Sequence, residues 1–216
     1  MPNPPIRVLI ADDHTLVRES LVNLLQAEGA IDVVAQAADG PETVALAIAT
    51  RPDVVVADLS MPGLNGIEVV RRLREALPAT RVLVLTMHQE EEYVLQAVRA
   101  GAAGYLVKDS AASELLAAVR SLHAGRSHFG PQAAKAMAEQ MRHPERAVDD
   151  PYGRLTARER EVFHLIVEGL TTKEIARKLE ISAKTAENHR TRVLDKLDVR
   201  NTAELVRYAL RKGLLD

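Results

Sequence analysis

The strongest constraint on this chain is a regular alternation, in its first half, between short aliphatic runs and amphipathic stretches. The runs cover residues 7–11, 32–37, 54–57, 81–85 and 104–107. Nearly continuous aliphatic strands separated by helical patterns indicate βαβ units, in which helices cover both faces of a parallel sheet. The first half is therefore expected to form an α/β domain with a doubly wound, five-stranded parallel sheet.

Length and charge divide the chain into two modules. A chain of 216 residues can form two small domains. Residues 1–130 carry 11 Lys and Arg against 16 Asp and Glu, whereas residues 151–216 carry 14 against 10. Such asymmetry predicts modules with different partners, and the basic module is suggestive of nucleic acid.

A polar stretch joins the two modules. The segment RHPERAVDDPYG, over residues 142–153, contains two prolines and is typical of a linker. The predicted domains are residues 1–125 and residues 151–216. The joint over residues 126–150 has a short helix predicted over residues 132–141.

Composition predicts the compartment. The chain contains no cysteine, which excludes a disulfide framework and a thiolate metal site. No apolar run approaches the roughly 18 residues that span a bilayer. The first residues, MPNPPIR, lack the pattern of a signal peptide. We therefore expect a cytoplasmic protein without a membrane partner.

The second module has an all-helical pattern from Leu155 onwards. Four positions fit a helix N-cap, and three of them are followed three residues later by glutamate, as in a capping box. The four positions predict four short helices. They are Thr156 with Glu159, Thr171 with Glu174, Asn201 with Glu204, and Ser182 without the glutamate.

Polar side chains follow four of the predicted strands. Asp12 and Asp13 follow the first strand, Asp58 the third, Thr86 the fourth and Lys108 the fifth. A single acid in such a place is commonly a turn former or a helix cap. In a doubly wound sheet, however, ligands bind beyond the carboxyl ends of the strands. Three carboxylates, a hydroxyl and a lysine at one edge therefore predict a site.

The residue types indicate which chemistry this site performs. Clustered carboxylates repel one another and need a cation or protons. Oxygen ligands favour Mg²⁺, which commonly binds carboxylates together with waters and phosphate oxygens. Lysine is a common partner for phosphate, and a carboxylate can itself become an aspartyl phosphate. The sequence thus predicts a Mg²⁺-dependent phosphoryl site.

The segments ADDH, DLSMPGLNG, LT and GYLVKD resemble the receiver domain of two-component response regulators, over about residues 5–125 and in the right order. The resemblance implies a flavodoxin-like fold and phosphorylation of Asp58 by a sensor histidine kinase. It also implies that Mg²⁺ is held by Asp13, Asp58 and the main-chain carbonyl of Ser60, with Asp12 acting through a water.

The same resemblance implies a switch beside the acids. Lys108 would pair with the phosphoryl oxygens, and Thr86 would hydrogen-bond one of them and draw its loop inward. Tyr105 would change rotamer together with Thr86. Many receivers have a proline after the lysine, whereas this chain has Asp109, so we expect no cis peptide there.

Residues 155–206 resemble the DNA-binding domain of the LuxR/NarL class of regulators, a likeness that extends over nearly all of residues 153–212. It implies a helix-turn-helix module whose recognition helix, Ser182 to Leu197, enters the major groove. Helical periodicity separates an apolar face of this helix from a polar one. The apolar face has Ala183, Ala186, Val193, Leu194 and Leu197, and the polar face has Lys184, Glu187, Asn188, Thr191 and Asp195.

A solvated polar face is common to most amphipathic helices, and it is the resemblance that favours DNA contacts here. It implies base-edge contacts from Lys184, Glu187, Asn188 and Thr191. By helical angle Arg190 falls on the apolar face, so we expect its stem to pack while its guanidinium reaches outward. The expected contacts to the DNA backbone come from Thr185, His189, Arg190, Arg192 and Lys173.

These features together predict a transcription factor, not an enzyme, in which phosphorylation of Asp58 promotes dimerisation and binding to double-stranded DNA. RNA polymerase is a further candidate partner. One alternative is a Mg²⁺-dependent phosphatase of the haloacid dehalogenase type. Such an enzyme needs a second acid where this chain has Ser60. The other alternative is a DNA-binding protein with an inactive receiver, against which the full set of site residues argues.

The last predicted helix, Glu204 to Leu210, leaves one question open. Its apolar stripe fits a dimer seam and a domain core equally well. The stripe consists of Leu205, Val206, Ala209 and Leu210.

Overall fold

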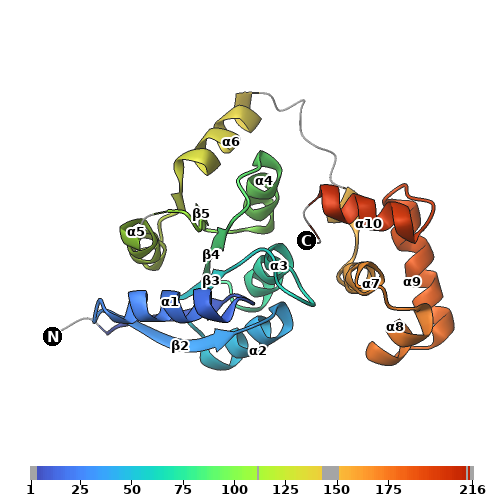
Figure 1. Cartoon of the computed structure of the whole chain (residues 1–216), viewed down its shortest axis with the longest axis horizontal. Coiled ribbons are helices and arrows are strands. Elements are labelled where there is room, and N and C mark those ends of the chain that lie inside the picture. The colour runs from blue at the N-terminus through green and yellow to red at the C-terminus, as the bar shows by residue number, and fades with distance from the viewer. Residues whose placement is uncertain (1–3, 111, 143–150, 213, 215–216) are drawn as a thin grey trace. The chain divides into compact units, whose positions relative to one another are not determined.

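The computed structural model describes residues 4–110, 112–142, 151–212 and 214. The chain forms two compact units, Met1–Pro144 and Glu145–Asp216. Figure 1 shows a sheet with helices around it in the first unit and helices alone in the second. Of the joint predicted over residues 126–150, residues 143–150 lie outside the described part of the chain.

The first unit contains a parallel sheet with the strand order β2-β1-β3-β4-β5-β6. The predicted α/β, doubly wound fold class is confirmed, but the described residues form a sheet of six strands where the sequence predicted five. The sixth strand pairs with Gly104 and Tyr105 of the fifth. It lies in the segment HAGRSHFGPQ, whose glycines and proline predicted a break in regular structure. The strands are β1 (Ile6–Ala11), β2 (Ile31–Ala37), β3 (Val54–Ala57), β4 (Arg81–Thr86), β5 (Gly104–Val107) and β6 (His128–Phe129).

Helices cover both faces of this sheet, which explains why the strands are almost continuously aliphatic. Successive strand residues point to opposite faces. Leu9 and Val55 join the cluster with α2, α3, α4 and α6, whereas Val8 and Val54 join the cluster with α1 and α5. The helices are α1 (Thr15–Gln26), α2 (Gly40–Thr50), α3 (Gly66–Ala76), α4 (Glu91–Ala100), α5 (Ala112–His123) and α6 (Pro131–Arg142).

The strand order reverses at β1, which lies between β2 and β3. Ala11, the last residue of β1, pairs with Ala57, the last residue of β3. Asp12 and Asp58, which follow these residues, are therefore brought side by side at the carboxyl edge. A reversal of this kind is where open α/β sheets bind their ligands.

The second unit confirms the four predicted helices and their caps. Thr156 and Thr171 form complete capping boxes, and the side chains of Ser182 and Asn201 accept hydrogen bonds from Thr185 N and Glu204 N. No helix of the described residues is long and apolar enough to cross a bilayer. After a 3-10 helix at Pro151–Arg154, the helices are α7 (Ala157–Val167), α8 (Thr172–Lys178), α9 (Ala183–Lys196) and α10 (Thr202–Arg211).

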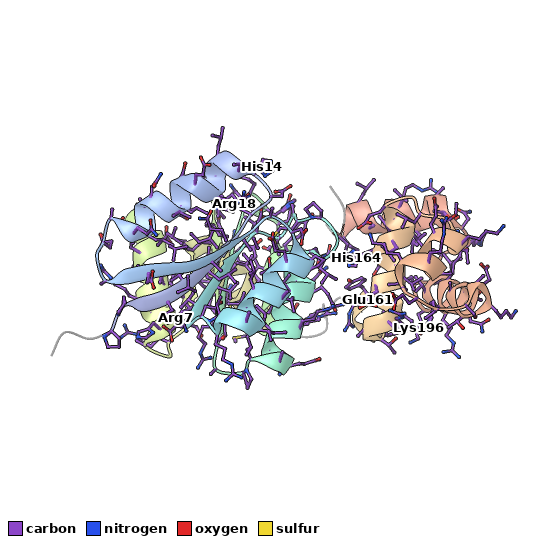
Figure 2. All side chains as sticks on the ribbon, turned by 90° about the horizontal axis from the view of Figure 1, so that it is seen from below. Arg7, His14, Arg18, Glu161, His164 and Lys196 are labelled. Carbon is purple, nitrogen blue, oxygen red and sulfur yellow. The ribbon has the colours of Figure 1, made fainter. Side chains whose placement is uncertain are left out.

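An ion pair fastens the end of α9 to the start of α7. Lys196 Nζ lies 2.7 Å from Glu159 Oε2, and the Glu159 side chain is only 3% exposed (Figure 2 labels Lys196). The same Glu159 oxygen accepts a 2.8 Å hydrogen bond from Thr156 N. Burial opposes ionisation of Glu159, but the hydrogen bonds from Lys196 and Thr156 outweigh it and hold the pKa of Glu159 below its usual value.

Because the pKa of Glu159 is lower in the folded than in the unfolded chain, this ion pair stabilises the fold above the ordinary glutamate pKa. The stabilisation is lost as pH falls through the lowered value. Glu159→Gln should cost about 1–3 kcal/mol of unfolding free energy near neutral pH, because Lys196 loses its charged partner. Hydrogen exchange of the α7 and α9 amides, measured at several pH values, checks this.

Glu161→Gln is the comparison, since Glu161 pairs with Arg158, three residues away in the same helix, and its side chain is 27% exposed where that of Glu159 is 3% exposed. Ion pairs that water reaches contribute less than buried ones, about 0–1 kcal/mol. If Glu159→Gln and Glu161→Gln lose equal unfolding free energy at neutral pH, the buried ion pair stabilises the fold no more than the more exposed one.

Candidate functional site

The carboxyl edge of the sheet gathers the acids that the sequence predicted. Asp12 is 1% exposed and Asp58 is 4% exposed, whereas the Asp13 side chain is 32% exposed. One ligand atom from each of these three residues and from His14 lies within 4.8 Å of the others. Two buried carboxylates and a partly exposed one therefore share a single small site.

Lys108, which follows β5, holds the two buried carboxylates together. Its Nζ lies 2.6 Å from Asp58 Oδ2 and 2.7 Å from Asp12 Oδ2. The other carboxylate oxygen of Asp58 accepts a 2.7 Å hydrogen bond from Leu59 N. Both oxygens of Asp58 are thus fixed in direction by contacts within the protein.

The charges of this site are strongly coupled. Burial raises the pKa of Asp58, and the neighbouring Asp12 adds to the rise, although Lys108 and Leu59 N oppose it. Burial alone would lower the pKa of Lys108, but its hydrogen bonds to Asp12 and Asp58 raise it above the usual value. The Lys108 ammonium therefore stays charged between the two buried carboxyl groups.

The donor set fits a hard divalent cation. Carboxylate oxygens at one edge of the sheet are the ligands that Mg²⁺ uses in proteins. Asp12, Asp13 and Asp58 supply them. Ser60, two residues after Asp58, lies in the adjoining β3–α3 loop, where its hydroxyl is 3.1 Å from His88 Nε2.

The switch residues of the sequence analysis meet in the β4–α4 loop. Thr86, the last residue of β4, is fully buried, and its hydroxyl accepts a 3.3 Å hydrogen bond from His88 N. The buried Tyr105 donates its hydroxyl to His88 O at 3.0 Å, and burial raises its pKa. The described residues contain no cis peptide, as expected for the bond before Asp109.

His88 lies at the same edge of the sheet, although the sequence pattern did not predict it. Its ring contacts Ser60 and stacks on Tyr93 with centroids 4.2 Å apart, and its main chain binds Thr86 and Tyr105. The segment LTMH contains it, two residues after Thr86, but no periodicity marks it. It joins the loop after β3 to the loop after β4.

The second unit presents the predicted polar face of α9 to solvent. Of the nine predicted DNA contacts, seven side chains are exposed, and His189 and Arg190 are half-buried. Ala186, Val193 and Leu197 are buried as predicted. Ala183 is exposed instead, because it is the first residue of α9 and lies beside the exposed Ser182. The seven exposed side chains are Lys173, Lys184, Thr185, Glu187, Asn188, Thr191 and Arg192.

Two of these nine side chains are tied to neighbouring helices. Glu187 Oε2 accepts a 3.0 Å hydrogen bond from the hydroxyl of Thr172 in α8. Arg190 donates to the hydroxyl of Thr202 at the start of α10. The guanidinium of Arg190 therefore contacts another helix of its own unit. The sequence had predicted that it would reach outward into solvent.

The apolar stripe of α10 divides into two parts. Leu205 and Ala209 are fully buried in the core of the second unit, and Val206 packs partly against that core. Leu210 is 50% exposed. The core interpretation is therefore correct for Leu205 and Ala209, whereas Leu210 lies at the surface of the second unit.

Comparison with known families matches both units. Residues 8–120 match the response regulator receiver domain, and residues 154–209 match the bacterial regulatory proteins of the luxR family. The chain belongs to the LuxR-type two-component response regulators. The oxygen regulatory protein NreC of Staphylococcus haemolyticus is 38% identical over 98% of this chain and 100% of its own length. NreC of Staphylococcus carnosus is 37% identical over the same shares.

Solved structures agree with this assignment. A LuxR-family response regulator from Aurantimonas sp. SI85-9A1 is 41% identical over 63% of this chain and 98% of its own, with a TM-score of 0.61. An RcsB–DNA complex matches 94% of this chain and 97% of its own at 26% identity and a TM-score of 0.59. The chain is thus a response regulator that acts as a transcription factor.

Proposed function

We propose that a sensor histidine kinase phosphorylates this response regulator on Asp58, and that phosphorylation controls its binding to DNA. In this proposal residues 1–125 receive the phosphoryl group and residues 151–216 bind double-stranded DNA. The observation that carries it is the buried Asp58 carboxylate, held 2.6 Å from Lys108 beside Asp12. Incubation with acetyl phosphate tests it, because a hydroxylamine-sensitive adduct should form on Asp58.

The arrangement suits direct phosphoryl transfer. An oxygen of Asp58 attacks the phosphorus of the kinase's phosphohistidine. A phosphorus–oxygen bond forms as the phosphorus–nitrogen bond breaks, and the imidazole leaves with that electron pair and takes up a proton. Lys108 then moves its ammonium from the Asp58 carboxylate to a phosphoryl oxygen. Mg²⁺, when bound, would neutralise phosphoryl charge.

Asp12, Asp13 and Asp58, with the main-chain carbonyl of Ser60, are the residues we propose to hold Mg²⁺. Asp13→Ala should weaken Mg²⁺ binding by about tenfold or more, since it removes a carboxylate ligand. Titration calorimetry of the full chain measures this loss. Asp32→Ala is the control, because Asp32 is an exposed acid at the opposite, amino end of the sheet. Equal Mg²⁺ affinity in both variants would contradict the ligand assignment.

Contacts around Thr86 give the phosphoryl signal a physical route to the joint between the units. Tyr105 binds the loop after β4 through His88 O and pairs with Phe129 in β6. The same loop accepts a 3.2 Å hydrogen bond at Gln89 from Gln132 in the first turn of α6. A shift of Thr86 toward a phosphoryl oxygen would therefore disturb the contacts that this loop makes with Tyr105 and with Gln132 of α6.

We further propose that the active form is a homodimer on DNA. One solved structure among the similar proteins is described as two RcsB dimers bound to two parallel DNAs. Two modules on neighbouring half-sites gain affinity by linkage. The exposed Leu210 on α10 is our candidate for the dimer contact of the second unit.

Beryllofluoride, which mimics the phosphoryl group, should double the mass of the full chain in sedimentation experiments. Leu210→Asp should weaken that dimer, because it places a charge in an apolar contact. Leu16→Asp makes the same change in the first unit, since Leu16 is an exposed leucine of α1, and it shows whether that unit also contributes to the dimer. A monomer with and without beryllofluoride would count against the dimer proposal.

A further inference from the structure

A histidine lies among the acids of the phosphoryl site. His14 Nδ1 is 2.7 Å from Asp13 Oδ1 and 3.5 Å from Asp12 Oδ1. Its ligand atom belongs to the same group, within 4.8 Å, as those of Asp12, Asp13 and Asp58. The site therefore offers one imidazole nitrogen together with its carboxylate oxygens.

The main chain that carries this imidazole is fixed. His14 N donates a 2.9 Å hydrogen bond to Asp12 Oδ1, and Arg18 Nη1 donates a 2.6 Å hydrogen bond to Asp12 O (Figure 2 labels His14 and Arg18). His14 occupies the N-cap position of α1, yet its side chain makes no capping hydrogen bond. The imidazole is thus not used for capping and is turned toward the acids.

Imidazole changes which metals a site prefers. Mg²⁺ takes oxygen ligands almost exclusively, whereas imidazole is a good ligand for Co²⁺, Ni²⁺ and Zn²⁺. We propose that His14 is a nitrogen ligand of the divalent-cation site and increases its preference for first-row transition metals over Mg²⁺. This inference rests on the cation site of the proposed function, and it adds a ligand and a metal class to that site.

A surface ion pair between His14 and Asp13 is the simpler role for the same contact. The His14 side chain is 67% exposed, and an ion pair so accessible to water is screened and stabilises the fold only weakly. The two roles differ in what they affect. A surface pair leaves the order of metal affinities unchanged, whereas a nitrogen ligand changes the affinity for Co²⁺ much more than the affinity for Mg²⁺.

Calorimetric titration of the full chain with Co²⁺ and with Mg²⁺ tests the inference. His14→Ala should weaken Co²⁺ binding by about tenfold or more and change Mg²⁺ binding by less than about twofold. His123→Ala is the matched control, because His123 is also an exposed imidazole near a carboxylate, 3.9 Å from Asp53. That variant should bind both metals as the wild type does.

A second readout does not depend on affinity. Electron spin echo spectroscopy of the Mn²⁺-loaded chain should show nitrogen-14 modulation from a directly bound imidazole. The modulation should persist in His123→Ala and vanish in His14→Ala.

The outcomes separate the inference from the proposed function. Absence of binding for both Mg²⁺ and Co²⁺ to the wild type would overturn the cation site itself. Suppose instead that the wild type binds both metals. An equal effect of His14→Ala on the Co²⁺ and Mg²⁺ affinities, or a wild-type spectrum without nitrogen modulation, would then overturn only the role of His14. The Mg²⁺ site would then stand with oxygen ligands only.

Discussion

Asp58→Asn is expected to abolish the hydroxylamine-sensitive phosphoryl adduct that acetyl phosphate and Mg²⁺ form on the wild-type chain. An amide is not a nucleophile at this position, and no other carboxylate among the described residues has the same contacts with Lys108 and Leu59 N. Mass spectrometry of the intact chain, before and after hydroxylamine, measures the adduct directly.

The same substitution should leave the fold intact. Burial and the neighbouring Asp12 raise the pKa of Asp58, so its ionised form is disfavoured in the folded chain. That cost is present at neutral pH and disappears as pH falls through the raised pKa. A neutral amide removes it, so the unfolding free energy of Asp58→Asn should equal or exceed that of the wild type.

Asp109→Asn is the control for this experiment. Asp109 is an exposed acid next to Lys108 in the chain. Asp109 should take no part in phosphoryl transfer, and Asp109→Asn should be phosphorylated like the wild type. Persistence of the adduct in Asp58→Asn, or its loss in Asp109→Asn, would show that the acceptor has been wrongly assigned.

Lys184→Ala and Asn188→Ala are each expected to cost about 1–3 kcal/mol in binding to a specific DNA site. Both side chains are exposed and lie four residues apart, toward the N-terminal end of α9. Lysine favours guanine and asparagine pairs with adenine at base edges. The binding free energy that these variants lose should be much smaller on a scrambled duplex, so the ratio of specific to non-specific affinity should fall.

Arg192→Ala provides the contrast. Arg192 is also exposed on α9 and is proposed to contact a phosphate. Its loss should weaken all sequences alike and make the salt dependence shallower by about one unit of slope. Fluorescence anisotropy with a site selected from a random pool, and with a scrambled duplex, at several salt concentrations distinguishes the two patterns. If Asn188→Ala weakens binding to both duplexes equally, Asn188 does not contact a base edge.

Much of this molecule follows from local pattern. The aliphatic runs predicted the five main strands because a sheet covered on both faces needs apolar side chains on both. The N-caps of the second unit were found because a cap is defined by residues three positions apart. The acids met at one edge because the carboxyl ends of parallel strands share it.

The parts that were missed depend on contacts between distant residues. Strand β6 has two residues, too few for any periodicity, and exists through its pairing with β5. His88 reaches Ser60 because of the path that the loop after β4 takes. The neighbours of His88 in the sequence do not determine that path. Helical angle placed Arg190 on the apolar face correctly, but Thr202, its partner, lies in a different helix.

The most direct test of the central claim is the affinity of the full chain for a selected DNA site, before and after acetyl phosphate and Mg²⁺. Wild type and Asp58→Asn should be measured in parallel by fluorescence anisotropy, with the phosphorylated fraction determined in the same samples. Control of DNA binding through Asp58 predicts that the dissociation constant of the wild type falls on phosphorylation, while that of Asp58→Asn stays constant. A fully phosphorylated wild type with an unchanged dissociation constant would contradict the account.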